Sequence, residues 1–486
     1  MDINLVNRFY KYAINFGSYI LLSKIIIFIQ LFYLWKNLSL ENLGKIALIQ
    51  VIIIILSPFL SFAGSEIVQR FFYEWKNKNI EKENITIIFL ITIIFNSLIC
   101  IILYFFSSDL FFFLLKNIEF NPLIKLSIIY VFLDTFKIVP HGLLRITNNY
   151  KLYGLLNAIR SILSLMFCFF FISFQNLELI GFLYANILAD FIMCIFYLLY
   201  IKNNFLNFFG IQSINKKNLI GFYKYGLPLI PAALSENFSN IVDKILLEKY
   251  VPLSQIGTYN ISNLAGSSIG VLNNALRLSA IPMLFENIAN KGKTNTGSML
   301  SEVTKIYIFT TATFSLLISI FIKYLLLPLN LKSVEIVVNF IPYFVIYYFF
   351  QTMVATYGRG IDLSKKTIYA PFIMLLNFII NFILMFFLVT SHGVLGAIFG
   401  LILSTLIKLL IQGYFAIKFF PRKLNLLFLF ILIASYILIF LISDYVFSIF
   451  SISISTFIID SIIFSLGTYI FFYFFLKKDI INKKKI

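Results

Sequence analysis

The chain has 486 residues, of which 60% are hydrophobic and only 12% are charged, and its formal net charge is +18. A soluble domain carries roughly 25% charged residues, so the composition excludes an ordinary water-soluble enzyme or binding module. The apolar stretches recur from end to end, many are near the roughly 20 residues that cross a bilayer, and they are continuous rather than alternating. We therefore predict an all-α integral membrane protein.

Fourteen apolar segments are predicted as transmembrane helices. In chain order they cover residues 12–34, 42–64, 85–106, 122–146, 151–173, 178–200, 221–247, 254–284, 303–327, 333–357, 366–389, 393–418, 424–446 and 453–476. The seventh, 221–247, is the least apolar because the string SENFSN interrupts it. Polar residues inside a span usually face a bundle interior or a watery cavity, so we expect this string to turn away from lipid.

Positive charge is distributed unequally between the predicted loops. With the N-terminus inside, the inward loops and the tail carry 25 lysines and arginines, and the outward loops and helix ends carry 7. Cytoplasmic loops carry this excess, so both termini are predicted to be cytoplasmic, and the net charge is explained without a nucleic-acid partner. Trp35 and Trp75 follow the ends of apolar segments, where we expect them at the membrane interface.

Short strings recur in the same order in the two halves of the chain. FYKY occurs at 9–12 and at 222–225, and LENLGK at 40–45 matches LSQIGT at 253–258, both 213 residues apart. Two further pairs, KLYGLLNAIR with KTIYAPFIML and GFLYANILADFI with GAIFGLILSTLI, are 215 apart. Each half holds six predicted helices, an even number, so both halves enter the membrane from the same side. Such parallel repeats occur in transporters.

The repeat divides the chain into four predicted parts. They are an N-terminal six-helix bundle (1–205), a cytoplasmic linker (206–220), a C-terminal six-helix bundle (221–420), and two additional helices with a basic cytoplasmic tail (421–486). In transporters with internal repeats the substrate site lies between the repeats.

Three longer strings resemble a known family. YGLPLIPAALSENFSNIVDKILLEKYVPLSQIGTYNIS (225–262) has a GLP start, a mid-helix polar patch, Asp followed by a base, and then G-x-Y. LSFAGSEIVQRFFYE (60–74) and SKKTIYAPFIMLLNFIINFILMFFLVTSHGVLGAIFGLILS (364–404) accompany it. In this order, with fourteen predicted helices, they resemble the Wzx-type oligosaccharide flippases of the multidrug/oligosaccharidyl-lipid/polysaccharide exporter superfamily. The chain departs from the family at Lys244, where Arg is frequent.

The resemblance implies a V-shaped pair of six-helix bundles that rock about a central cavity. It implies a substrate that consists of a short sugar chain on an undecaprenyl pyrophosphate carrier. This lipid-linked oligosaccharide would move from the cytoplasmic to the outer leaflet of the bacterial inner membrane, for surface polysaccharide such as the O-antigen of lipopolysaccharide. Membrane lipids are implied partners, with a polysaccharide polymerase and other assembly proteins as further candidates. No cofactor is implied.

Two alternative functions are open at this point. The first is a cation-coupled multidrug antiporter of the same superfamily, but such antiporters mostly have twelve helices, and Lys24 and the two extra segments argue against it. The second is a membrane-embedded polysaccharide polymerase or ligase. Those families generally present a large outward loop with basic catalytic residues, and the longest outward loop predicted here spans only about residues 107–121.

Ionisable and polar residues inside the predicted spans are the candidates for a site, because they are costly in lipid and usually functional. The residues assigned to substrate binding are Lys24, Arg160, Glu236, Asn237 and Arg277. The residues assigned to gating or ion coupling are Asp134, Lys137, Asp190, Asp243 and Lys244. No catalytic set, metal-ligand set or nucleotide-binding motif is predicted.

Lys24 and Glu236 are placed at equivalent depth by the 213-residue offset, which aligns Lys24 with Asn237. A pyrophosphate in a low-dielectric cleft needs cationic partners, which Lys or Arg supplies. Two interpretations stay open: a buried Lys24–Glu236 pair that holds the halves together, and contact of Lys24 with the pyrophosphate. Asp243 and Lys244 lie near the predicted outer end of the same segment as Glu236 and are candidates for an outer gate.

Other candidates also have two interpretations. Asp134 and Lys137 are three residues apart on one predicted helix, which favours a local pair. Arg160 either faces the cavity or pairs with Asp190 on the next helix. Arg277 either contacts an incoming headgroup or snorkels to the interface.

Overall fold

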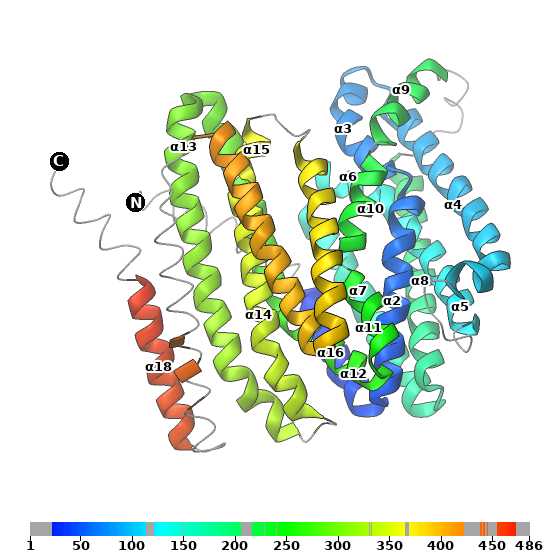
Figure 1. Ribbon diagram of the computed structural model, residues 1–486. Helices are drawn as coiled ribbons and strands as arrows, with labels where there is room; N and C mark the ends of the chain where they lie inside the picture. The colour runs from blue at the N-terminus through cyan, green and yellow to red at the C-terminus, as the bar shows by residue number, and fades with distance from the viewer. Residues whose placement is uncertain are drawn as a thin grey trace. The chain divides into compact units, whose positions relative to one another are not determined.

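The computed structural model confirms the all-α class predicted from the sequence (Figure 1). The residues that it describes are 22–112, 121–147, 149–205, 216–227, 229–239, 241–329, 331, 333–364, 369–421, 438–439, 441–442, 445 and 454–472. Every regular element within these ranges is helical, and seven helices among them are long and apolar enough to cross a membrane.

Each predicted segment except 424–446, which lies mostly outside the described residues, contains helix. The first helix is described over 22–37. The helices that follow are α2 (Leu40–Ser61), α3 (Gly64–Asn77), α4 (Glu81–Phe112), α5 (Asn121–Asp134), α6 (Ile138–Ile146), α7 (Tyr150–Cys168), α8 (Glu178–Asn204), α9 (Lys216–Gly226), α10 (Leu229–Ser239), α11 (Val242–Tyr250), α12 (Leu253–Gly266), α13 (Ser268–Leu326), α14 (Val334–Tyr357), α15 (Arg359–Leu363), α16 (Tyr369–Phe419) and α18 (Ile454–Phe472). Short 3-10 turns follow α5 and α13, and a π-helical turn follows α7.

Two predicted segments are interrupted in the structure. Segment 42–64 breaks at Phe62 and Ala63, whose φ angles of 41° and 54° are left-handed, and the chain continues as α3 to Asn77. The Phe62 ring stacks on that of Phe95 at 3.8 Å between centroids, which fixes the break by packing. Segment 221–247 is three helices, α9, α10 and α11.

One predicted loop is wrong in the opposite sense, because helix runs through it, and a second coincides with a kink. Residues 285–302, a loop in the sequence prediction, belong to α13, which is continuous over 59 residues. This stretch contains no proline, so its residues keep their backbone donors and meet no ring clash. The predicted connection near residue 391 coincides with a kink at Gly393, whose non-helical backbone (φ 55°, ψ −126°) divides α16 into two helices. Only glycine adopts that conformation at low cost.

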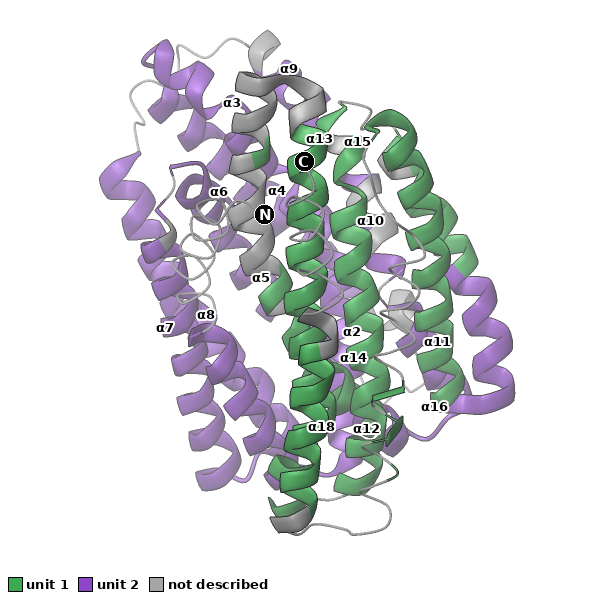
Figure 2. Cartoon of the chain, turned by 90° about the vertical axis from the view of Figure 1, so that its left-hand side faces the viewer, with its two compact units in different colours: residues 1–18, 258–380, 395–486 green, residues 19–257, 381–394 purple. Residues whose placement is uncertain are grey.

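The chain forms two compact units (Figure 2). Unit 2 comprises residues 19–257 and 381–394, and unit 1 comprises residues 1–18, 258–380 and 395–486. The helices α9 to α11, which the sequence repeat places in the second bundle, are thus grouped with unit 2. The predicted bundles of 1–205 and 221–420 therefore remain a division based on sequence.

One hydrophobic core of unit 2 lies where α3, α4, α6 and α8 meet. Its buried residues are Ala63, Ile67, Val68, Phe72, Trp75, Ile85, Ile88, Phe89, Val139, Leu143 and Ile201. Trp35 and Trp75, which we predict at the depth of the membrane interface, are buried inside the protein at 1% and 2% exposure, and their interfacial depth stays a prediction. Each ring packs against aromatic neighbours, Trp35 on Phe32 and Trp75 on Phe71.

Unit 1 is built around α13, which packs against α14 and α18. An ion pair buried between two helices joins α13 to α18: Lys323 Nζ lies 3.2 Å from Asp460 Oδ2, and the two side chains are 7% and 0% exposed. The Tyr324 hydroxyl donates to the same carboxylate oxygen at 2.6 Å. Asp460 is therefore a packing residue of the added C-terminal helix.

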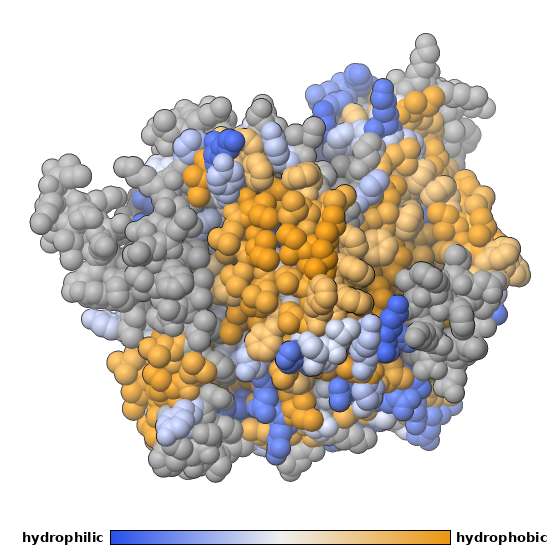
Figure 3. Space-filling view, viewed as in Figure 1, coloured by the Kyte–Doolittle hydropathy of each residue, from blue (hydrophilic) through white to orange (hydrophobic). Residues whose placement is uncertain are grey.

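The surface is hydrophobic where a membrane protein must face lipid. Large apolar side chains such as Phe372, Leu375 and Phe387 on α16 are half exposed or more. Figure 3 shows hydrophobic residues across the middle of this face and hydrophilic residues above and below them. The integral membrane class predicted from composition is confirmed.

Two glycines bring helices α2 and α12 into backbone contact within unit 2. A Cβ atom on Gly44 would lie 2.1 Å from the carbonyl oxygen of Leu253, and one on Gly257 would lie 2.2 Å from that of Leu40. Gly44 with Gly257, and Leu40 with Leu253, are each 213 residues apart. The contact therefore joins repeat-equivalent residues and is the same in both directions.

Candidate functional site

The first described helix, 22–37, presents three different faces. Ser23, Ile26 and Gln30 are buried in unit 2, whereas Leu22 and Ile25 lie on a half-exposed apolar face. Since an α-helix repeats every 3.6 residues, a third stripe lies apart from these two, and exposed Ile27, at 38%, borders it.

Lys24 begins this third stripe, which continues through Phe28, Leu31 and Trp35 at helical spacing. Exposure falls along it, from exposed Lys24 through half-buried Phe28 to Leu31 at 9% and Trp35 at 1%. The stripe is therefore open at the end nearer the N-terminus and closed at the other. The Lys24 ammonium makes no ion pair or hydrogen bond with any described residue.

The predicted relation between Lys24 and Glu236 stays a prediction, because the side chain of Glu236 lies outside the described residues. The same holds for the side chain of Arg277 on α13. Asn237, the repeat equivalent of Lys24, is described: its Nδ2 donates to the backbone carbonyl of Ile54 at 2.8 Å. Asn237 therefore ties α10 to the middle of α2.

Arg160 and Asp190 form a bidentate pair between α7 and α8. Arg160 Nε donates to Asp190 Oδ1 at 2.7 Å, and one of its terminal nitrogens donates to Oδ2 at 3.2 Å. The same terminal nitrogen donates to the Tyr130 hydroxyl at 3.1 Å and to Asn186 Oδ1 at 3.2 Å. Asp190 is 5% exposed and Arg160 23%. Of the two interpretations of Arg160, pairing with Asp190 describes this structure.

The pair belongs to a wider polar network inside unit 2. Ser164 donates to Asn186 Oδ1 at 3.0 Å, and Gln30 Nε2 donates to the Ser164 hydroxyl at 2.9 Å and to Cys168 Sγ at 3.0 Å. The network thus joins the first helix to α5, α7 and α8. Tyr130 and Asn186 are not among the predicted site residues, although each lies four residues before a predicted acidic residue, on the same helical face.

The predicted local pair of Asp134 and Lys137 is present. Lys137 Nζ is hydrogen-bonded to Asp134 Oδ1, and the side chains are 40% and 25% exposed for Lys137 and Asp134 respectively. Asp243 and Lys244 are both buried on α11, at 2% and 6% exposure. Their proposed role in an outer gate remains a prediction.

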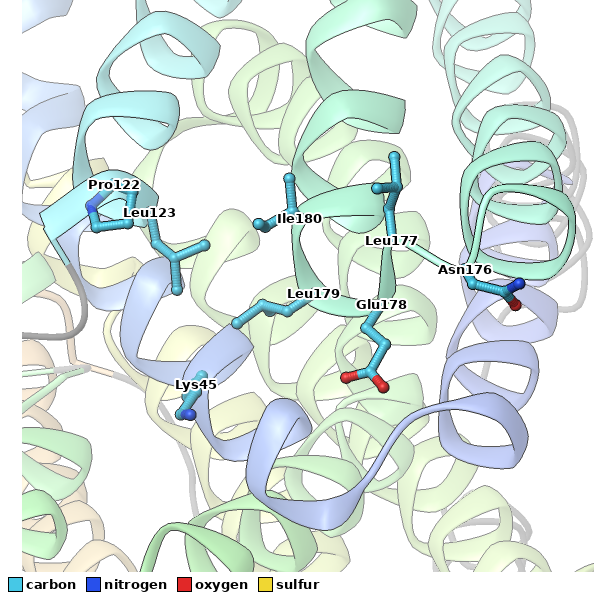
Figure 4. A pocket seen from close by; sticks show the side chains of 8 residues that line it. All are labelled: Lys45, Pro122, Leu123, Asn176, Leu177, Glu178, Leu179 and Ile180. Carbon is cyan, nitrogen blue, oxygen red and sulfur yellow. The ribbon is translucent and has the colours of Figure 1, made fainter.

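A pocket of about 450 Å³ opens in unit 2 where α2, α5 and α8 begin (Figure 4). It is lined by Lys45, Pro122, Leu123, Asn176, Leu177, Glu178, Leu179 and Ile180. Leu123, Leu179 and Ile180 point into the space. Both of its charged residues have partners: Lys45 forms an ion pair with Glu41 at 2.9 Å, and Glu178 accepts a hydrogen bond from Asn42 at 2.8 Å. None of the ten predicted site residues lines it.

The fold is similar to that of solved membrane transporters. The lipid II flippase MurJ in an inward closed conformation matches with a TM-score of 0.71 at 16% identity, over 96% of this chain and all of that one. An inward-facing multidrug resistance MATE family transporter of the MOP superfamily matches with a TM-score of 0.68 at 13% identity, over 82% of this chain and 93% of that one. The MATE transporter VcmN of Vibrio cholerae, in its bent form, matches with a TM-score of 0.57 at 16% identity, over 86% of this chain and 99% of that one. The chain therefore has the fold of the MOP superfamily of membrane transporters.

Family membership follows from a second comparison. Residues 12–288 match the model of the polysaccharide biosynthesis protein family, which is more than half of the chain, and the protein belongs to that family. The resemblance to polysaccharide-biosynthesis flippases predicted from the sequence is thereby confirmed. No curated protein matches the chain.

Proposed function

We propose that this protein is a flippase that moves undecaprenyl-pyrophosphate-linked oligosaccharide from the cytoplasmic to the outer leaflet of the bacterial inner membrane, by alternating access. Family membership supports a role in polysaccharide biosynthesis. A second support is the fold that the chain shares with transporters, one of which is a lipid II flippase. The proposed orientation has both termini in the cytoplasm.

The observation that carries the proposal is the position of Lys24. It is an exposed cation in a segment predicted to cross the membrane, on a stripe that closes toward Trp35 and lies between exposed Ile25 and exposed Ile27. A lysine facing hydrocarbon would be costly, whereas one facing an aqueous path can bind a phosphate as a point charge. We assign Lys24 to the pyrophosphate of the carrier.

The other candidates receive different roles. Arg160 is already neutralised by Asp190, so we assign it to holding the helices of unit 2 together. Asn237 is engaged with the carbonyl of Ile54 and positions α10. Glu236 and Arg277 remain candidates for substrate contact on the sequence argument alone.

Deletion of the gene tests the proposed function. Carrier-linked oligosaccharide should accumulate in the cytoplasmic leaflet and surface glycan should disappear, and the intact chain supplied in trans should restore both. The accumulated lipid is assayed in inverted and right-side-out vesicles with an impermeant glycosidase. Unchanged surface glycan together with altered resistance to cationic dyes would refute the flippase and indicate a multidrug antiporter.

A further inference from the structure

The pocket of about 450 Å³ in unit 2 lies where three helices begin, α2 at Leu40, α5 at Asn121 and α8 at Glu178 (Figure 4). The charge distribution predicts that each of these helix starts is at the outer side of the membrane. The volume is within the roughly 300–1,000 Å³ of small-molecule sites. None of the residues assigned to substrate binding or gating lines the pocket, so a ligand bound there is separate from the transport site.

The floor of the pocket is apolar and continues onto an exposed apolar surface. Leu123 and Leu179 are each 7% exposed, and both point into the space together with Ile180. From Ile180, a stripe of exposed apolar side chains follows α8 at helical spacing, through Tyr184, Leu188, Phe191 and Ile195. The stripe rises about 22 Å along the helix axis, which is more than half of the roughly 30 Å hydrocarbon core. An acyl chain can therefore follow it from the pocket into the membrane.

The pocket carries one cation and one anion on neighbouring helices. The Lys45 side chain on α2 is only 18% exposed, whereas its ion-pair partner Glu41 is 57% exposed. A pair with an exposed partner four residues away on one helix is weak, so the ammonium can turn to a ligand. Glu178 on α8 is exposed, and among described residues its carboxylate accepts one hydrogen bond, from Asn42 at 2.8 Å. Asn42 and Lys45 share one face of α2, so Lys45 is on the face that meets Glu178.

The wall that carries Glu178 is fixed by packing. α7 ends in a π-helical turn, Phe169–Phe174, and Asn176 and Glu178 follow it with left-handed φ angles of 52° and 41°. This conformation is unfavourable for a residue with a side chain, and it persists where the surrounding structure imposes it. Gly181 contributes to that packing, because a Cβ there would lie only 3.1 Å from Phe171 Cβ. The carboxylate is thus presented from a preformed wall.

We propose that this pocket binds a zwitterionic phospholipid with a primary amine, of the phosphatidylethanolamine type, from the outer leaflet. Lys45 donates to the phosphate, Glu178 accepts from the ammonium, and an acyl chain follows the stripe on α8. The two charges select this headgroup. An anionic glycerol headgroup would leave the carboxylate without a cation, and a trimethylammonium group has no hydrogen to donate to it. The inference does not depend on the proposed function.

Lipid binding to the purified, delipidated protein tests the site. The protein in detergent is titrated with phosphatidylethanolamine, phosphatidylcholine or phosphatidylglycerol that carry the same acyl chains, and the first bound lipid is measured by native mass spectrometry. Phosphatidylethanolamine should bind with about tenfold or more higher affinity than the other two, which is the effect of one charge-assisted hydrogen bond. Equal affinity for all three lipids would overturn the proposal.

Two variants of the pocket separate the roles of its charges. Lys45→Gln should weaken binding of phosphatidylethanolamine and phosphatidylcholine alike, by about tenfold or more, because both lipids contain the phosphate. Glu178→Gln should abolish the preference for phosphatidylethanolamine over phosphatidylcholine and leave binding of phosphatidylcholine unchanged.

The matched control is Lys125→Gln. Lys125 is a half-buried lysine of α5 that lies 5.6 Å from the centre of the Tyr104 ring and does not line the pocket, so this variant should bind lipid as the wild-type protein does. If Lys45→Gln does not accumulate, Glu178→Gln, at an exposed position, decides by itself. A preference that persists in Glu178→Gln, or that is lost equally in Lys125→Gln, would refute the assignment.

Discussion

The carboxylate of Asp190 on α8 receives two hydrogen bonds from the guanidinium of Arg160 on α7, at 2.7 and 3.2 Å. Removing one member of a buried pair leaves the other charge uncompensated. Arg160→Ala should therefore lower the free energy of unfolding by roughly 3 kcal/mol. The double variant Arg160→Ala/Asp190→Asn should lose less of this free energy than Arg160→Ala does. The stabilities of the wild-type protein and the two variants are ranked by heating the detergent-purified proteins and measuring the unaggregated fraction by size-exclusion chromatography.

The matched control is the pair of Arg70 with Glu74 at 2.8 Å, in which both side chains are about half exposed. Exposed pairs contribute about 1 kcal/mol or less, so Arg70→Ala should change stability little. Equal losses for Arg160→Ala and Arg70→Ala would contradict the structural role of Arg160.

The Lys323–Asp460 pair should behave as a unit. Lys323→Met alone strands a carboxylate that is 0% exposed and should destabilise the protein by roughly 3–5 kcal/mol. Lys323→Met/Asp460→Leu replaces both charges by apolar groups and should recover most of that loss. Protease sensitivity of the C-terminal region in membranes, compared among these variants, is the measurement. A double variant as unstable as the single one would be evidence against this pairing.

Two glycines of α16 should respond to alanine with opposite signs. Gly393 has φ 55°, so Gly393→Ala forces a left-handed alanine and should cost about 1–2 kcal/mol. Gly413 lies in regular helix, and a Cβ there would meet Tyr357 at an ordinary 3.8 Å. Gly413→Ala should stabilise by about 0.5–1 kcal/mol. The melting midpoint of each purified variant is compared with that of the wild-type protein. Midpoints that shift in the same direction for both variants would contradict the kink at Gly393.

Lys24→Ala should abolish or strongly reduce complementation of the deletion strain at normal membrane levels. Losing one charge-assisted contact to a phosphate costs about 1.5–3 kcal/mol, which corresponds to roughly 10–150-fold weaker binding. Lys24→Arg should retain activity, because Arg also binds phosphate. Lys36→Ala, an exposed lysine near the other end of the same helix, is the control. Full surface glycan with Lys24→Ala would remove this residue from the site.

The features that could be predicted from the sequence depend on short residue spacing along one helix or on the polarity of whole segments. Helix class followed from continuous apolar runs, and the Asp134–Lys137 pair followed from residues three apart on one helix. The pairing of Arg160 with Asp190 could only be offered as an alternative, because it depends on the rotation of α7 and α8 about their axes. Gln30 was missed for the same reason.

Breaks within helices could not be predicted from composition. Phe62 and Ala63 adopt left-handed backbone without being glycine, since tertiary packing such as the Phe62–Phe95 stack decides the conformation. The burial of Trp35 likewise depends on its neighbours and not on its place at a segment end. In contrast, the repeat aligns Gly44 with Gly257 in two matching strings. The alignment shows that the two positions are equivalent, but it does not predict that they are in contact.

The buried carboxylate of Asp460 has a consequence for biogenesis. α18 is the last described helix of the chain, and an aspartate near the middle of a span raises the cost of its insertion into lipid by roughly 2.5–3.5 kcal/mol. Its ammonium partner, Lys323, is synthesised more than a hundred residues earlier. α18 is therefore expected to integrate poorly by itself and to be retained in the bilayer by docking on α13, so that its insertion reports on correct assembly of α13.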